Sequence, residues 1–215
     1  MNAEELPKVS ICMPIYNRNN FKPLILNNLL GLDYPRDKLE FCIDDDGTEP
    51  FFYNNQEQEI LKKLIHPIKL NYYYRKHKRT IGAKRNNLVK IASHKNYSCV
   101  GSNQMIFLYP HHNWTCHAIR CASKRQIHEA CMLFTKKHWS SMGGFKSTSQ
   151  GEGSKMADFK KKNVGLLEIN KCMACICHND NTINKDMFMK EDNEIPGNVS
   201  EECKNMVNKI LNISP

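Results

Sequence analysis

A short apolar strand that ends in three consecutive carboxylates is the feature that most limits how this chain can fold. Residues 39–43 are typical of a buried strand, and Asp44, Asp45 and Asp46 follow directly, before a Gly-Thr turn. Like charges this close repel one another, so the three acids are costly unless something uses them. In an open α/β sheet the carboxyl ends of the strands are where ligands bind. The pattern therefore predicts a nucleotide site at this edge of a sheet.

Strand-like and helix-like segments alternate over residues 8–92. We expect strands at 8–13, 39–43 and 68–74, and helices at 21–32, 56–65 and 81–92, where apolar residues recur at helical spacing. This alternation predicts an α/β fold with a mostly parallel, doubly wound sheet. The later pattern is weaker: it indicates strands at 105–109, 130–134, 166–169 and 171–177, a short helix at 150–160, loop at 180–198 and a helix at 199–211.

Charge is spread unevenly along the chain, which carries a net charge of +9. Its 215 residues are enough for one α/β domain. From residue 60 to residue 128 there is no Asp or Glu, while the same stretch holds fourteen Lys or Arg and seven His. Such a block suits a polyanion, namely a diphosphate, an acidic glycan or a nucleic acid, and equally a solvated basic face. Because no nucleic-acid-binding motif or aromatic stacking pattern occurs, we expect no nucleic-acid partner.

The cysteines and the N-terminus bear on the compartment. No apolar stretch is long enough to span a membrane, and the acidic N-terminus lacks the apolar core of a secretory signal. We therefore interpret the ten cysteines as free thiols of a cytoplasmic protein. The segment 172–178, Cys-Met-Ala-Cys-Ile-Cys-His, would suit zinc, but a second Cys-x-x-Cys at finger-like spacing is missing. A buried thiol-rich strand is the preferred interpretation.

Five short motifs occur in the order typical of one enzyme family. They are VSICMPIYNR at 9–18, IDDDGT at 43–48, GAKRN at 82–86, the group FTKKHW, GGF and GEG within 134–153, and CHNDNT at 177–182. Together they resemble the GT-A glycosyltransferases of the family 2 type, most closely those encoded by large DNA viruses. The resemblance implies a GT-A, Rossmann-like single domain over 1–198, with a nucleotide-binding half at 8–92, an acceptor half at 99–182, and a C-terminal helix or tail at 199–215.

The resemblance also implies a set of donor residues for a UDP- or GDP-linked sugar. Pro14, Tyr16 and Asn17 would form the loop under the nucleotide base. Asp45 would bind the base or ribose, with Asp44 or Asp46 beside it. Lys84 and Arg85 would approach the diphosphate.

Further roles follow from the same resemblance. Glu152 would be the general base that takes the proton from an acceptor hydroxyl of a glycan or protein. Gly143, Gly144 and Trp139 would lie at the acceptor or donor sugar. His178 would lie near the diphosphate or its metal, which in this family is Mn²⁺ or Mg²⁺.

The sequence departs from the family at its metal-binding element. Metal-dependent members carry an Asp-x-Asp motif at the end of a strand after the Arg-Asn helix, but here no acid occurs between Ala92 and Glu129. We interpret this as a deletion that truncates the middle of the domain. Two hypotheses remain: a sugar transferase with Glu152 as its base, and a catalytically inactive relative that binds a nucleotide, a glycan or a partner protein.

Overall fold

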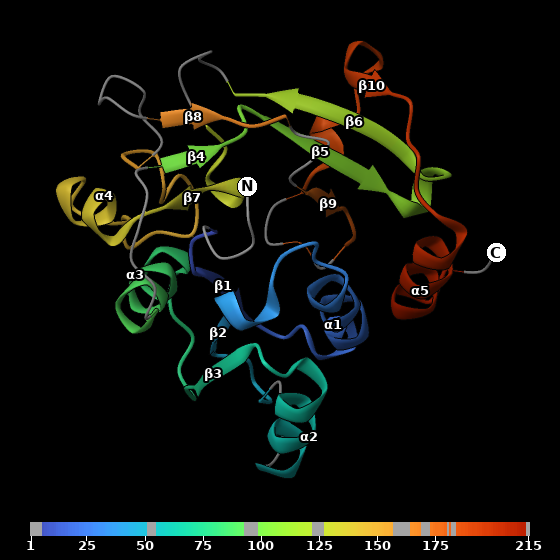
Figure 1. Ribbon diagram of the computed structural model, residues 1–215. Coiled ribbons are helices and arrows are strands. Elements are labelled where there is room, and N and C mark those ends of the chain that lie inside the picture. Colours follow the sequence, from blue (N-terminus) through green and yellow to red (C-terminus); the bar gives the residue numbers. More distant parts are fainter. Residues whose placement is uncertain are drawn as a thin grey trace. The chain divides into compact units, whose positions relative to one another are not determined.

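The chain divides into two compact units. The computed structural model describes residues 6–50, 55–92, 99–121, 127–156, 164–168, 173–179, 181 and 184–213. The first unit comprises residues 1–98 and 134–156, and the second comprises residues 99–133 and 157–215 (Figure 1). Segment 134–156, which the sequence placed in an acceptor half, therefore belongs to the same unit as the predicted nucleotide-binding half. The single domain over 1–198 stays a prediction.

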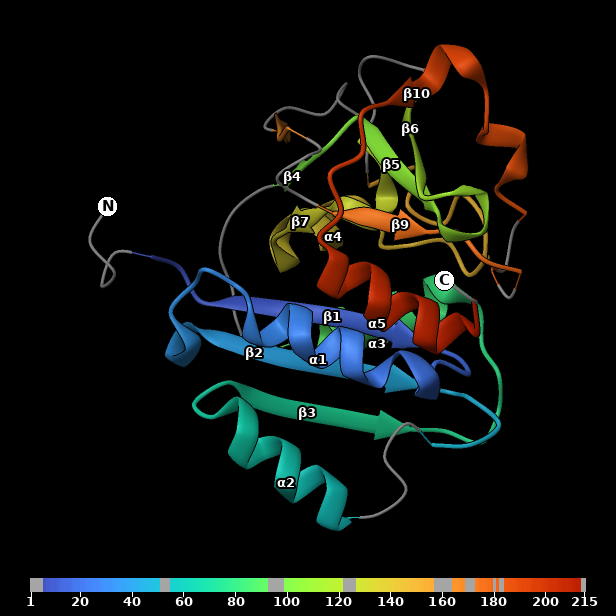
Figure 2. The ribbon, with the colours of Figure 1, turned by 90° about the vertical axis from the view of Figure 1, so that its right-hand side faces the viewer.

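A three-stranded parallel sheet is the centre of the first unit. Its order is β1-β2-β3, so that β2 has a neighbour on each side. The strands are β1 (Val9–Ile15), β2 (Leu39–Asp45) and β3 (Lys69–Tyr74), and the helices are α1 (Lys22–Leu30), α2 (Asn55–Ile65), α3 (Ile81–Ile91) and the short α4 (Lys136–Ser141). In Figure 2 the three strands lie side by side with their arrowheads pointing the same way.

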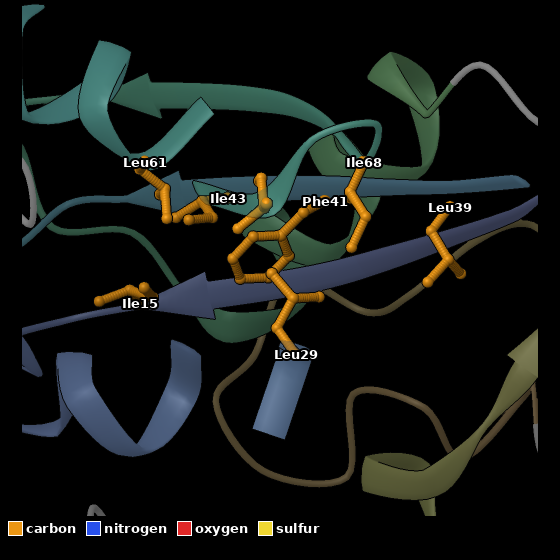
Figure 3. Close-up of a cluster of buried hydrophobic side chains, with 8 residues drawn as sticks. Ile15, Leu29, Leu39, Phe41, Ile43, Leu61 and Ile68 are labelled. Carbon is orange, nitrogen blue, oxygen red and sulfur yellow. The ribbon is translucent and has the colours of Figure 1, made fainter. Parts of the chain in front are cut away.

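The alternation of side chains along β2 gives the sheet two covered faces. Phe41 and Ile43 point to one face, where they pack with Leu29 of α1 and Leu61 of α2 (Figure 3). Side chains alternate between the two faces along a strand, so the residue between Phe41 and Ile43 points to the other face. There Cys42 packs against Leu88 of α3. Helices thus cover both faces, which confirms the predicted parallel sheet flanked by helices.

The second unit is built on a mixed four-stranded sheet of order β10-β6-β5-β9. β5 (Gln104–Tyr109) and β6 (Thr115–Arg120) form an antiparallel pair, β9 (Ala174–Ile176) adds in parallel to β5, and β10 (Glu194–Ile195) adds antiparallel to β6. A smaller sheet has the order β7-β4-β8, with β7 (Leu133–Phe134), β4 (Cys99–Gly101) and β8 (Val164–Leu166). Helix α5 (Glu201–Leu211) begins at Ser200, whose Oγ accepts a hydrogen bond from Cys203 N at 3.2 Å.

Short 3₁₀ helices connect several of these elements. They are Asn19–Phe21 and Arg36–Lys38 in the first unit, and Pro110–His112, Glu129–Cys131, Asp186–Phe188 and Glu191–Asn193 in the second. None of the helices in the described ranges combines the length and the apolar character that a membrane span requires.

The α/β class is confirmed, and the elements of residues 8–92 lie within a few residues of their predicted bounds. Strands β4, β6 and β10 and helix α4 were not predicted, and β10 lies within the segment 180–198 that was expected to be loop. β6 reads Thr-Cys-His-Ala-Ile-Arg, which has little β pattern of its own and is a strand because it pairs with β5 over its whole length. The helix predicted at 150–160 is wrong for the residues that the structure describes, because residues 151–156 form a bend and turns. Residues 157–160 lie outside the described ranges.

Phe41 offers a test of the core of the first unit, because it is buried at the centre of the α1–β2–α2 cluster. Phe41→Ala should lower the free energy of unfolding by about 3–5 kcal/mol, through lost burial and a residual cavity. Urea denaturation followed by circular dichroism measures this. The control Leu64→Ala truncates a side chain that is 53% exposed on α2, and should change the stability by about 0.5 kcal/mol or less. Equal effects of the two substitutions would contradict the core assignment.

Candidate functional site

The three acids at the end of β2 are buried, and two of them are paired with cations. Asp44 accepts hydrogen bonds from Arg79 Nη2 at one oxygen and from Asn87 Nδ2, at 2.7 Å, at the other. Asp46 accepts from Lys84 Nζ at 2.6 Å and from the backbone N–H of Arg79 at 2.5 Å. Opposite charges therefore offset the mutual repulsion that made this acid cluster costly in the sequence.

Asp45, the acid expected at the base or ribose, accepts hydrogen bonds from two neutral groups. Its Oδ1 accepts from Gly47 N at 3.0 Å and its Oδ2 from the hydroxyl of Tyr72 at 2.8 Å. Asp45 is 1% exposed, and the 44–46 segment as a whole is buried at the carboxyl edge of the sheet.

Lys84 lies away from the surface. Besides Asp46, its Nζ donates to the carbonyl of Ile15 at the end of β1, at 2.9 Å, and its side chain is 4% exposed. The structure therefore brings Lys84 to a carboxylate and a strand end, where it joins α3 to β1 and β2. The sequence placed it at a diphosphate, and that contact stays a prediction.

The loop after β1 reaches the same edge. Asn17 has the left-handed φ of 49°, which asparagine tolerates better than most residues, and its Oδ1 accepts from Thr48 N at 2.8 Å and Thr48 Oγ1 at 3.1 Å. Tyr16 is half-buried, with Lys78 Nζ 4.2 Å from its ring centroid. Pro14 does not belong to this loop, because β1 continues through it, opposite Asp44. Proline is tolerated there because β1 is an edge strand.

Glu152 lies against the first turns of α3 in the same unit. Its Oε1 is 3.2 Å from Arg85 Nη1, and its side chain is 5% exposed. Gly82 makes this approach possible, since a Cβ at that position would lie 1.6 Å from the carbonyl oxygen of Lys146. The backbone N–H of Gly82 also donates to Thr148 O at 3.0 Å. The structure thus brings together Arg85 and Glu152, which the sequence assigned to the donor and the acceptor half.

Asn86 holds residues 143–145, the glycine-rich segment, and sequence reasoning missed this role. Its Nδ2 donates to Phe145 O at 2.9 Å, and its Oδ1 accepts from Phe145 N at 2.8 Å and from Trp139 Nε1 at 2.9 Å. Gly143 and Gly144 have φ of +75° and +74°, a region that favours glycine. Trp139 and Gly144 therefore meet Asn86, and no sugar contact is needed to explain them. Asn86 is the last letter of the GAKRN motif, which was its only signal.

His178 lies in the second unit, where it lines a polar cavity of about 230 Å³. Its backbone N–H donates to Asn181 Oδ1 at 3.0 Å. Burial, with Cys177 beside it, raises the pKa of Tyr109 in the same cavity. The other polar or titratable lining residues are His111, His112, Asn179, Asn184, Lys185 and Asp186. Within the described ranges no three His, Cys, Asp or Glu side chains are grouped to hold a metal ion, and Cys172 and Asp180 lie outside those ranges.

Comparison with known proteins supports the fold. No protein-family model matches the chain, and no curated protein is recognisably similar to it in sequence. The solved structure of mannosyltransferase PcManGT from Pyrobaculum calidifontis, in complex with GDP-Man and Mn²⁺, matches with a TM-score of 0.53 and 17% identity. The match covers 81% of this chain and 58% of that chain, so this chain spans less than two thirds of its neighbour. The likeness shows a glycosyltransferase fold of the GT-A type.

The buried pair of Lys84 and Asp46 can be tested by removing the cation alone. Lys84→Met should lower the free energy of unfolding by about 3–5 kcal/mol, because it leaves a buried carboxylate without its charge partner. A double-mutant cycle with Asp46→Asn, measured by urea denaturation, should show that the two losses are not additive.

The matched control removes a cation from an exposed pair. Lys62 Nζ lies 2.6 Å from Glu59 Oε1 at the surface of α2, and Lys62→Met should cost about 1 kcal/mol or less. Equal destabilisation by Lys84→Met and Lys62→Met would contradict the burial of the Lys84–Asp46 pair.

Proposed function

We propose that this chain binds a nucleoside diphosphate sugar at the carboxyl edge of the β1–β3 sheet and transfers the sugar to a hydroxyl of a glycan or protein. The observation that carries the proposal is that Asp45 and the Tyr16–Asn17 loop lie at one edge of the sheet, in the same unit as the Arg85–Glu152 pair. The neighbour's complex with GDP-Man supports a nucleotide-sugar donor of the UDP- or GDP-linked class. The cytoplasmic location and the viral type of the enzyme stay predictions from the sequence.

In this proposal two acids have separate roles. Asp45, which Gly47 N and the hydroxyl of Tyr72 hold in place, accepts a hydrogen bond from the base or ribose. Glu152, oriented by Arg85, takes the proton of the acceptor hydroxyl. As that proton leaves, the hydroxyl oxygen bonds to the anomeric carbon, and the nucleoside diphosphate departs with the electrons of the broken sugar–phosphate bond.

A second candidate is an inactive relative that only binds a nucleotide or glycan. The internal pairing of Asp44 and Asp46 favours it, because those carboxylates already have partners within the protein. Incubation with a panel of UDP- and GDP-sugars and mixed glycan acceptors, with detection of released nucleoside diphosphate, separates the two. Acceptor-dependent release supports transfer, whereas tight nucleotide binding without release supports the binding protein.

Asp45→Asn tests the nucleotide contact while preserving the shape of the side chain. We expect the Kd for the bound nucleotide to rise about tenfold or more, since a bond to a charged acceptor is replaced by a weaker one. Isothermal titration calorimetry measures the Kd, and circular dichroism checks the fold. The control Tyr72→Phe removes a partner of Asp45 but keeps the acid, and should have the smaller effect. An unchanged Kd for Asp45→Asn would overturn this assignment.

Glu152→Gln tests the general base. The rate of sugar transfer should fall by about 100-fold or more, because the amide cannot take the proton of the acceptor hydroxyl. Donor binding should stay within about twofold of the unmodified chain, because Glu152 is assigned to the acceptor rather than the donor. A large rise in the donor Kd, with the transfer rate at saturating donor preserved, would place Glu152 in the donor site.

A further inference from the structure

The carboxylates at the end of β2 do not fit a divalent cation. A metal ion in a donor complex needs oxygen ligands that are free to reach it. Asp44 and Asp46 instead hold Arg79 and Lys84, and a metal at Asp46 would leave the buried ammonium of Lys84 without its partner. The described residues include no alternative group of three metal-ligating side chains. The charge of a donor diphosphate at this edge therefore needs another counter-charge.

The loop between β3 and α3 supplies one, and the acids hold it in place. Residues 75–79 read Arg-Lys-His-Lys-Arg. At one end of this loop the backbone N–H of Arg75 donates to Asp45 O at 2.9 Å, and at the other the backbone N–H of Arg79 donates to Asp46 Oδ2 at 2.5 Å. Both ends of the loop are thus fixed to the end of β2, beside the predicted nucleotide contacts.

The middle of this loop is exposed. Lys76, His77 and Lys78 are exposed, whereas Arg79 is bonded to Asp44. Lys78 reaches back across the edge, with its Nζ 4.2 Å from the ring centroid of Tyr16 in the loop after β1. A cation over an aromatic face at an exposed site gains only about 0.5–1 kcal/mol, so a phosphate can draw this ammonium away. Its departure would free the face of Tyr16 for a base.

The balance of charge at this edge is positive. Segments 15–19, 44–50 and 74–84 together carry six Lys or Arg and only four Asp or Glu. Two of these acids, Asp44 and Asp46, pair with two of these cations, Arg79 and Lys84, which leaves the excess of positive charge unchanged. An exposed excess of cations attracts an anion and repels a metal ion.

We infer that the diphosphate of a nucleoside diphosphate binds to Lys78 and Lys76 at the carboxyl edge of the β1–β3 sheet, without a divalent cation, while its base lies on Tyr16. This inference rests on the proposed function and deepens it. Lysine suits the task because its ammonium is a mobile point charge with three donors. The anchored ends of the loop keep the backbone of residues 76–78 beside the end of β2, so that base, ribose and phosphate contacts would come from one edge.

The test is calorimetric titration of the full chain with GDP, UDP, guanosine and uridine, once in EDTA and once in Mn²⁺. One diphosphate should bind in EDTA with a Kd within about threefold of its value in Mn²⁺, and at least about tenfold tighter than its nucleoside. Lys78→Ala and Lys76→Ala should each weaken that binding about tenfold. The matched control Lys63→Ala removes an exposed lysine of α2 in the same unit and should leave the Kd unchanged.

The outcomes separate this inference from the proposed function. Binding that EDTA abolishes and Mn²⁺ restores would overturn the metal-free site and leave nucleotide binding intact. Equal Kd values for Lys78→Ala and Lys63→Ala, or for nucleoside and diphosphate, would likewise overturn the role of the loop alone. No binding of either diphosphate to a chain with native circular dichroism would refute the proposed function, and the inference with it.

Discussion

The buried ion pair between Lys84 and Asp46 is the contact on which the rest of the first unit depends. Its 2.6 Å bond joins the first turns of α3 to the end of β2, and the same ammonium holds the end of β1 through Ile15 O. The second oxygen of Asp46 fixes the end of the connection that leads into α3 through Arg79 N. Neither charge is tolerable alone at this depth, because each would lose its hydration without compensation. The two therefore fix one arrangement of helix and strands.

Helix α3 transmits that arrangement to the glycine-rich segment. The residues directly after Lys84 are Arg85, which meets Glu152, and Asn86, which bonds both the N–H and the carbonyl of Phe145. Three successive side chains of one helix thus define where the acid cluster and Glu152 lie relative to each other. This packing of α3 against the segment that carries Glu152 requires glycine at position 82, because any side chain there would collide with the carbonyl of Lys146. The separation between the proposed donor contact and the proposed base is thus set by rigid elements, as catalysis by positioning requires.

The sequence predicted the framework of this unit because that information is local. Apolar spacing located three strands and three helices, and the run of acids indicated which edge matters. The partners of those acids could not be predicted in the same way, since Arg79 and Asn87 lie 35 and 43 residues from Asp44 in the chain. The same reason explains Lys84, whose motif suggested a phosphate and whose contact in the fold is Asp46.

Strand β6 of the second unit and helix α4 of the first were harder to predict for a related reason. The short strand β6 has little β pattern of its own, and α4 has six residues, too few for a helical period to be recognised. Both exist through tertiary pairing and capping: β6 pairs with β5, and Thr135 Oγ1 accepts from His138 N at 2.8 Å at the start of α4. The order of motifs, by contrast, indicated an α/β fold of the GT-A type that the likeness to a mannosyltransferase supports.

The acid-free block, residues 60–128, is easier to interpret in the fold than in the sequence. Read along the chain, the lack of an Asp-x-Asp element suggests only that something is missing. In three dimensions the acids before the block are internally paired, and the basic loop 75–79 from within it is anchored on them. The ligand at a charged edge responds to the charge that remains exposed, and not to the number of acids in the sequence. Acids that serve as anchors and lysines that stay exposed are the basis for the proposed anion site at this edge.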